Sequence, residues 1–211
     1  MYEIAIIDYG INNLFSVKRA FDILGTKSVI TSDLDVIASS KSVILPGVGA
    51  FPYAMSNLKK LNLDKSIYEF VRSGKPIMGI CLGMQLLMES SVEFEKVDGL
   101  GLIKGTTCKF KYQKIDNESY PIPQIGWNKI HKGTNHWENT ILNKNSNEDF
   151  MYFVHSYYVI PSENISLADT IYGDIHYCSA FQKENIIGVQ FHPEKSGMIG
   201  LNIFKSFIEM I

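Results

Sequence analysis

Short apolar runs alternate with stretches of helical periodicity through residues 1–90, and this alternation restricts the fold more than any other feature of the chain. The runs are almost continuously apolar, which is typical of strands buried on both faces. The expected strands are Glu3–Asp8, Val29–Thr31, Ser42–Leu45 and Pro76–Ile80. Helical spacing occupies Asn13–Leu24, Phe51–Ser73 with a break at Leu61-Asn62, and Leu82–Glu89. Strands that alternate with helices predict a parallel sheet covered by helices on both faces.

The second half of the chain has a different pattern. From about Gly99 onward, short β-like runs follow one another, and helical periodicity returns only in Ile199–Ile211. This pattern predicts a mixed or antiparallel extension of the same sheet. Lys132–Asp149 is mostly polar, which is typical of a long mobile loop. The expected fold is therefore α/β, with a central, largely parallel sheet in a single domain that spans residues 1–211.

Composition and charge argue against several classes of function. The formal net charge is −2 and no basic stripe is present, so nucleic-acid binding is not expected. No apolar run is long enough to span a bilayer, and the N-terminus lacks the basic start of a signal peptide. The three cysteines lie far apart, with no CxxC pair and no Cys/His metal spacing. We expect no disulfide framework, no metal site, no membrane association and a cytoplasmic location.

The strongest local signal is the segment Gly79-Ile80-Cys81-Leu82-Gly83, between an expected strand and an expected helix. Small residues on both sides of a nucleophile allow a strand to turn abruptly into a helix, and the nucleophile is then exposed on the turn. The positive end of the following helix favours a thiolate. A buried structural cysteine between glycines that are needed for packing is the alternative reading of this segment.

A second signal is the pair His192 and Glu194, which are separated only by Pro193. In an extended segment, residues two apart point to the same side. A nucleophilic cysteine needs a general base, and a carboxylate that orients the base fixes its tautomer. A histidine alone is more often structural, but with Glu194 and Cys81 the pair predicts a catalytic triad.

The loop Leu45–Phe51 contains the sequence Pro-Gly-Val-Gly after an expected strand. Its backbone can approach a ligand closely because glycine carries no side chain. The N–H groups around Val48 and Gly49, with that of Leu82, are therefore candidates for an oxyanion hole. A tight turn without catalytic function would use the same residues.

Three segments together, LPGVGAF at Leu45–Phe51, GICLGMQLL at Gly79–Leu87 and GVQFHPEKSG at Gly188–Gly197, resemble the class I, or triad, glutamine amidotransferases. Four more stretches carry the resemblance along nearly the whole chain: IIDYG at Ile6–Gly10, NLFSVKRA at Asn13–Ala20, IGWN at Ile125–Asn128 and YFVHSYY at Tyr152–Tyr158. These narrow it to one branch of the family, the glutaminase subunits of imidazole glycerol phosphate synthase.

The resemblance implies a glutaminase with Cys81 as nucleophile, His192 as base and Glu194 as the orienting acid. It further implies contacts to the substrate glutamine from a set of residues around the elbow: Gly49, Leu82, Gln85, Glu93, Ser156 and Tyr157. For Gln85 the alternative is a polar helix residue that faces solvent, and for Glu93 the alternative is likewise a polar residue without a role in binding. The implied chemistry needs no metal and no organic cofactor. His155 lies in an aromatic strand, where we expect a structural histidine.

The same resemblance implies a partner, a β/α-barrel synthase subunit that receives ammonia in a heterodimer. Four residues are expected on the docking side: Asn12, Gln124, Trp127 and Tyr152. Two of them depart from the family pattern, which has a second glycine at position 12 and a histidine at position 124. Because of these departures, a second function stays open as an alternative: a paralogous subunit that supplies ammonia for amidination of a bacterial surface sugar. Alternatives of other classes are a cysteine hydrolase or peptidase, and a catalytically silent regulatory subunit.

Overall fold

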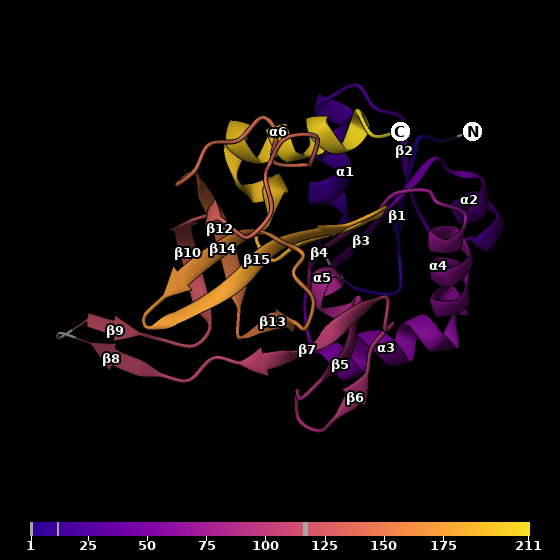
Figure 1. The fold of residues 1–211 in the computed structure, drawn as a ribbon. Coiled ribbons are helices and arrows are strands. Elements are labelled where there is room, and N and C mark those ends of the chain that lie inside the picture. The colour runs from indigo at the N-terminus through magenta and orange to yellow at the C-terminus, as the bar shows by residue number, and fades with distance from the viewer. Residues whose placement is uncertain (1, 12, 116–117) are drawn as a thin grey trace.

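The computed structural model describes residues 2–11, 13–115 and 118–211, and one large sheet runs through it (Figure 1). Twelve of the described strands belong to this sheet, with the order β2-β1-β3-β4-β16-β15-β13-β7-β5-β6 along its main path. The first five strands in this order pair in parallel. They are β2 (Ser28–Thr31), β1 (Ile4–Ile7), β3 (Ser42–Gly47), β4 (Ile77–Cys81) and β16 (Ile186–Val189). The predicted parallel sheet is thereby confirmed.

The remaining strands form a largely antiparallel half. Strand β15 (Ile175–Lys183) pairs antiparallel with β16, and it joins the two halves of the sheet. The others are β13 (Tyr157–Pro161), β7 (Ile103–Lys109), β5 (Met88–Ser91), β6 (Val97–Asp98), β14 (Ser166–Tyr172) and β11 (His131–Lys132). Two separate pairs lie beside this sheet: β10 (Gln124–Lys129) with β12 (Phe150–His155), and β8 (Gln113–Ile115) with β9 (Glu118–Tyr120). The predicted mixed extension is confirmed.

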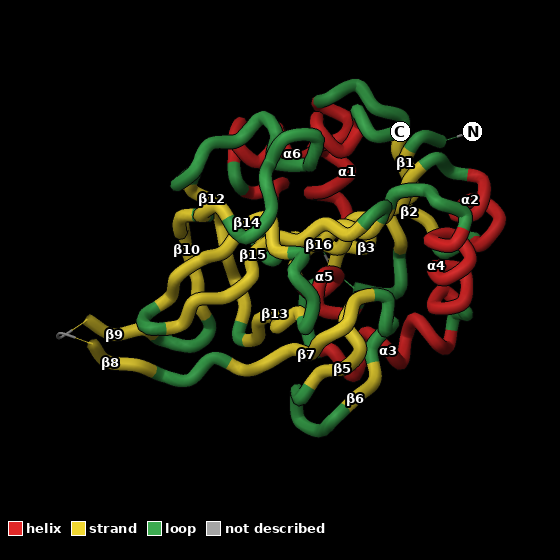
Figure 2. The backbone as a smooth tube through the Cα atoms, in the orientation of Figure 1, coloured by secondary structure: helices red, strands yellow, loops and turns green. Residues whose placement is uncertain are grey.

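Helices cover both faces of the parallel half (Figure 2). Alternate residues of β1 show this: Ile4 and Ile6 pack into one apolar cluster, and Ala5 and Ile7 pack into another. Helices α1 (Leu14–Ile23) and α6 (Gly197–Ile208) contribute to the first cluster. Helices α2 (Leu34–Ser39), α3 (Phe51–Lys60) and α4 (Leu63–Arg72) contribute to the second. No helix among the described residues is long and apolar enough to cross a membrane.

The predicted break between two helices at Leu61-Asn62 is confirmed. Asn62 has a φ of 54°, and it separates α3 from α4. Left-handed backbone ends a helix, and asparagine tolerates it better than most residues. The helix expected over Leu82–Glu89 is shorter, however, because α5 ends at Leu86 and Met88 already belongs to β5.

The segment Lys132–Asp149 differs from the expected mobile loop. Its side chains Trp137, Ile141 and Leu142 are buried in the cluster that contains α1 and α6. The indole N–H of Trp137 donates to the carbonyl oxygen of Leu167, which ties the segment to β14. Three apolar side chains at irregular spacing therefore anchor a segment whose composition is mostly polar.

The elbow between β4 and α5 depends on the close approach of α5 to β3. A Cβ atom added at Gly83 would lie 1.7 Å from the carbonyl oxygen of Leu45. A Cβ at Gly79 would lie 2.6 Å from the carbonyl oxygen of Gly83. Both contacts are with backbone, which cannot move aside as a flexible side chain can. The two glycines are therefore required for packing as well as for the turn.

We predict that Gly83→Ala lowers the free energy of unfolding by about 3 kcal/mol or more. The added methyl group would overlap with backbone atoms, which cannot move aside as a flexible side chain can. Gly25→Ala is the control: Gly25 has a φ of +72° but no atom within 4 Å of an added Cβ. That control should lose only about 1–2 kcal/mol from backbone strain. Denaturant titration measures both. Equal losses in the two variants would contradict the packing argument.

Candidate active site

Cys81 occupies the turn between β4 and α5 with φ 54° and ψ −109°. A non-glycine residue with positive φ is strained, and such strain persists only where the surrounding structure imposes it. The parallel pairing of β4 with β3 and with β16 supplies that constraint. Cys81 is thus held at the carboxyl end of the sheet, as the sequence predicts for an elbow.

A cavity of about 270 Å³ opens beside Cys81. It is large enough for a small molecule, and the predicted loop Leu45–Phe51 lines one side of it with Val48 and Gly49. Its lining contains all the residues expected to contact glutamine or its oxyanion, together with three that were not expected. The expected ones are Val48, Gly49, Leu82, Gln85, Glu93, Ser156 and Tyr157, and the others are Pro123, Val154 and His155.

The polar side chains in this cavity are held by backbone groups. Gln85 is 5% exposed, and its Nε2 donates to the carbonyl oxygen of Tyr157 at 2.9 Å. Glu93 Oε2 accepts from the backbone N–H of Phe51 at 2.7 Å. Gln85 therefore does not face solvent, which removes the alternative of a surface helix residue. The other carboxylate oxygen of Glu93, Oε1, takes no part in this hydrogen bond.

His192 and Glu194 form a buried pair beside the sulfur, although Glu194 lies in the 3-10 helix η1 (Pro193–Lys195) and not in the extended segment that the sequence predicts. Their side chains are 1% and 0% exposed, and Nδ1 of His192 lies 2.7 Å from Oε1 of Glu194. Because a carboxylate accepts, Nδ1 carries the proton and Nε2 is the atom available for proton exchange. Burial acts to lower the pKa of His192, but Cys81 and Glu194 outweigh it and raise the pKa to about 10. The pair favours an imidazolium next to a negative charge on Cys81.

Side chains outside the expected set also reach the site. Asn13, at the start of α1, donates from Nδ2 to Oε1 of Glu194 at 2.6 Å. The hydroxyl of Tyr9, which is 1% exposed, donates to the carbonyl oxygen of Pro46 at 2.8 Å. Tyr9 thereby ties the end of β1 to the Pro-Gly-Val-Gly loop. Neither residue type is characteristic of a catalytic motif, so only the fold reveals these contacts.

His155 is a buried histidine packed among aromatic rings, which fits the structural role expected from the sequence. Burial lowers its pKa to about 4, with a smaller contribution from the charge of His192, and the hydrogen bond to Tyr157 opposes both. In the neutral ring, Nδ1 donates to the carbonyl oxygen of Tyr157 at 2.8 Å, because a carbonyl can only accept. Nε2 then faces the hydroxyl of Tyr177 at 3.3 Å.

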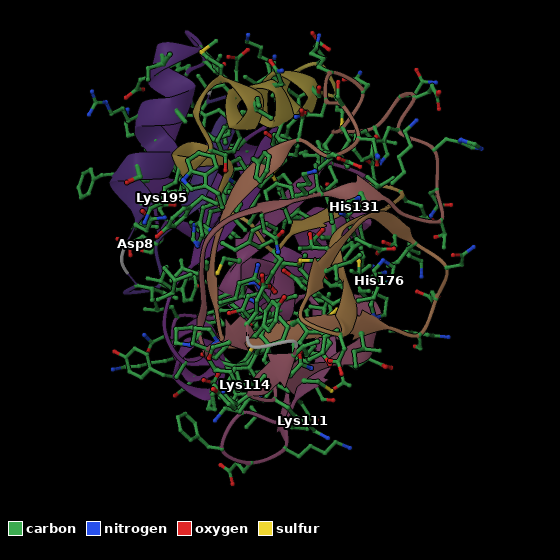
Figure 3. The ribbon with its side chains drawn as sticks, turned by 90° about the vertical axis from the view of Figure 1, so that its left-hand side faces the viewer. Asp8, Lys111, Lys114, His131, His176 and Lys195 are labelled. Carbon is green, nitrogen blue, oxygen red and sulfur yellow. The ribbon has the colours of Figure 1, made fainter. Side chains whose placement is uncertain are left out.

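The residues expected on the docking side divide into two groups. Trp127 and Tyr152 lie opposite each other on β10 and β12 with ring centroids 6.1 Å apart, and Trp127 is 55% exposed. Lys195 Nζ lies 5.8 Å from the Tyr152 ring, and Figure 3 shows this lysine on the face turned toward the viewer. Gln124 differs from the expectation, since it is 3% exposed and accepts from the Tyr177 hydroxyl. Asn12 lies outside the described residues.

Gln124 is buried because the strand alternation turns it inward. Ile125 and Trp127 are both exposed on β10, and Gln124 pairs with the buried His155 across the ladder to β12. A docked partner could sense this residue only through its neighbours. The departure from the family pattern at this position therefore affects an internal hydrogen-bond network.

We predict that His155 makes the fold sensitive to acid. Its folded pKa of about 4 lies below the unfolded value of 6.5, so stability is lost as pH falls from 6.5 toward 4. The wild type should lose about 2 kcal/mol between pH 7 and pH 5 from this residue. His155→Gln should flatten that part of the profile in urea titrations, and the exposed-site variant His136→Gln should not. Parallel profiles for all three proteins would refute the assignment.

Comparison with known proteins places this geometry in a family. The sequence profile of the family described as glutamine amidotransferase class-I matches residues 5–210. The chain is 46% identical to the HisH subunit of imidazole glycerol phosphate synthase from Lactococcus lactis, over 100% of both chains. It is 44% identical to the protein of the same name from Listeria monocytogenes, over 99% of this chain and 96% of the other.

Solved structures agree on the fold. A structure of PurLQS from Thermotoga maritima matches with a TM-score of 0.72 at 19% identity, covering 99% of each chain. The glutaminase domain of CTPS from Trypanosoma brucei matches with a TM-score of 0.63 at 16% identity, covering 100% of this chain and 95% of the other. With the profile match over residues 5–210 and full-length relatives above 40% identity, the chain belongs to the class I glutamine amidotransferases, in the branch of the HisH subunits of imidazole glycerol phosphate synthase.

Proposed function

We propose that this chain is the glutaminase subunit of an imidazole glycerol phosphate synthase, which hydrolyses L-glutamine and passes the ammonia to a β/α-barrel cyclase subunit. The observation that carries the proposal is the buried His192–Glu194 pair beside Cys81. Cys81 itself lines a cavity that also contains the polar side chains of Gln85 and Glu93. On this proposal residues 1–211 form one amidotransferase domain. A cytoplasmic location fits its three free cysteines.

In the first step the Cys81 sulfur attacks the side-chain carbonyl carbon of glutamine, and a carbon–sulfur bond forms. Negative charge develops on the carbonyl oxygen, for which the backbone N–H groups of Val48, Gly49 and Leu82 are the candidate donors. The carbon–nitrogen bond then breaks. The imidazolium of His192 gives its Nε2 proton to the departing nitrogen, which leaves as ammonia.

In the second step water adds to the glutamyl thioester. His192, now neutral, takes a proton from the water, the carbon–sulfur bond breaks, and glutamate leaves. Glu194 holds the His192 ring in one orientation and stabilises its charged form through Nδ1. Both steps use only groups of the chain and one water molecule, so the scheme calls for no metal and no organic cofactor.

The names of the relatives support a multi-subunit enzyme, because each is called a synthase subunit. Ammonia released into solvent would be lost as ammonium, so a glutaminase subunit works with an acceptor site on its partner. We assign the aromatic surface formed by the exposed Trp127 and the partly buried Tyr152 to that partner contact. The acceptor would be the phosphoribulosyl intermediate of histidine synthesis, and the alternative acceptor is an activated surface sugar.

We predict that Cys81→Ala abolishes glutamine-dependent activity, because neither Cys108 nor Cys178 lines the cavity. The complex with its partner should still work with added ammonium, since the acceptor site lies on the other subunit. Cys108→Ala is the matched control and should retain both activities. Glutamate release and product formation are measured in parallel. Glutamine hydrolysis by the Cys81→Ala variant near the wild-type rate would remove Cys81 as nucleophile.

We also predict that the isolated chain hydrolyses glutamine slowly, and that the partner loaded with its acceptor raises the rate at least roughly tenfold, or about 1.4 kcal/mol of barrier. The physical basis is the loop of Val48 and Gly49. Gly49 has a φ of +110°, which only glycine adopts readily, so its peptide groups can reorient at low cost. A partner that binds the orientation with an N–H aimed at the oxyanion shifts that population.

The assay compares the chain alone, with a histidine-pathway barrel, and with a surface-sugar barrel from the same genome. Stimulation by the first barrel alone supports the proposal. Stimulation by the second alone moves the chain to the sugar pathway and makes positions 12 and 124 the markers of that branch. Full activity in isolation, unchanged by either barrel, would refute the gated loop while the triad assignment would stand.

A further inference from the structure

A second amide lies beside the nucleophile and has no part in the mechanism above. Gln190 is 0% exposed, and its Nε2 lies 3.7 Å from Sγ of Cys81. Its Oε1 accepts from Nε2 of Gln85 at 3.1 Å. A fully buried glutamine is uncommon and needs partners for both ends of its amide. Here one partner is the reacting sulfur, and the other is a side chain of the substrate cavity.

Strand register puts Gln190 in this position. In the parallel pairing of β16 with β4, Val189 lies opposite Ile80. Gln190 follows Val189 and Cys81 follows Ile80, so the two residues occupy equivalent positions at the ends of neighbouring strands. The backbone N–H of Gln190 donates to the carbonyl oxygen of Ser179 at 2.9 Å, which fixes its place relative to β15. Gln190 and His192 are two residues apart in the chain, and both approach the same sulfur.

The direction of each amide follows from its partners. Gln85 faces the carbonyl oxygen of Tyr157, which can only accept, so its Nε2 must point there. The second N–H of Gln85 then goes to Oε1 of Gln190. This leaves Nε2 of Gln190 on the side of Cys81. These partners therefore fix which group donates and which accepts in each contact between the Tyr157 carbonyl oxygen and the Cys81 sulfur.

We propose that Gln190 supports the proposed glutaminase reaction in two ways: its amide N–H donates to the Cys81 sulfur and favours the thiolate, and its carbonyl oxygen positions Gln85 for the substrate. A hydrogen bond to a charged acceptor is stronger than one to a neutral acceptor, so an N–H donor selects the charged form of the sulfur. The first role stands on the fold alone, and the second rests on the proposed function.

Besides the N–H donor of Gln190, an acceptor also lies close to the sulfur of Cys81. The carbonyl oxygen of Val154 lies 3.9 Å from Sγ, and an acceptor at that place favours the protonated thiol. Gln190 acts in the opposite direction. Glu93 and His155 line the same cavity as Cys81, and the two titratable groups whose pKa values respond to Cys81 are His192, from the segment after β16, and Tyr9, from the end of β1. Of these two, His192 assists the thiolate as a cation, and the buried Tyr9 remains neutral because burial raises its pKa.

The test is the rate at which iodoacetamide alkylates Cys81 between pH 4 and pH 9, followed by intact mass and peptide mapping. Gln190→Met replaces the amide by an unbranched apolar side chain of similar length that cannot donate. The midpoint of its rate profile should lie at least about half a pH unit above that of the wild type. Gln182→Met is the matched control, since Gln182 contacts the backbone N–H of Ile141 away from the site. Its profile should coincide with that of the wild type.

A second measurement examines the link to Gln85. Gln190→Met and Gln85→Met should each lower kcat/KM for glutamine, and the double variant should be no worse than about the more impaired single variant, because the two amides act as a unit. Thermal unfolding checks that the variants fold, and Gln190→Leu replaces the Met variant if that one does not. A change that only loosened the core would lower the unfolding temperature and leave the alkylation midpoint in place.

Superimposable alkylation profiles for the wild type and Gln190→Met would overturn the donor role, and so would an equal shift in Gln182→Met. Multiplicative losses in the double variant would overturn the positioning role. Alkylation needs no glutamine, so a shifted midpoint in a chain that does not hydrolyse glutamine would retain the contact with the sulfur and refute the proposed function.

Discussion

The approach of α5 to β3, across the Gly83 backbone and the carbonyl oxygen of Leu45, is the contact on which the rest of the site depends. It allows the chain to leave β4 and enter α5 within one strained residue, Cys81. The strain is borne by backbone pairing on both sides of β4. Because protein interiors are close-packed, one added methyl group at this contact would displace Cys81 from the groups arranged around it.

Those groups come from both halves of the sheet, which meet at β16 and β15. The parallel half supplies the sulfur, the Pro-Gly-Val-Gly loop and, through the residues after β16, Gln190 and His192. The separate β10–β12 pair supplies Val154 and His155 of the cavity wall, and Tyr157 comes from β13 of the antiparallel half, with Ser156 between them. A cavity at the carboxyl ends of parallel strands is the common location of sites in α/β folds. Here the antiparallel extension closes it on one side.

Polar groups at the site lie in a row that runs from Asn13 through Glu194 and His192 to Cys81. Asn13 and the His192 Nδ1–H both donate to the same oxygen of Glu194. Glu194 and Cys81 in turn favour the imidazolium form of His192, because both raise its pKa. Asn13 stands directly before α1 and is partly exposed. The orienting acid of the proposed triad is therefore linked to the surface by one side chain.

The sequence by itself determined the alternation of strands and helices, the elbow at Cys81, the His192–Glu194 spacing and the family, because these are local patterns whose chemistry fixes residue types at short range. The tertiary structure alone decided the contacts of Tyr9, Asn13 and Gln190, the burial of Gln124, and the anchoring of Lys132–Asp149 by its apolar side chains. Each joins segments distant in the chain, or depends on which side of a strand faces inward. Strand register and packing set such contacts, and a local sequence pattern does not encode them.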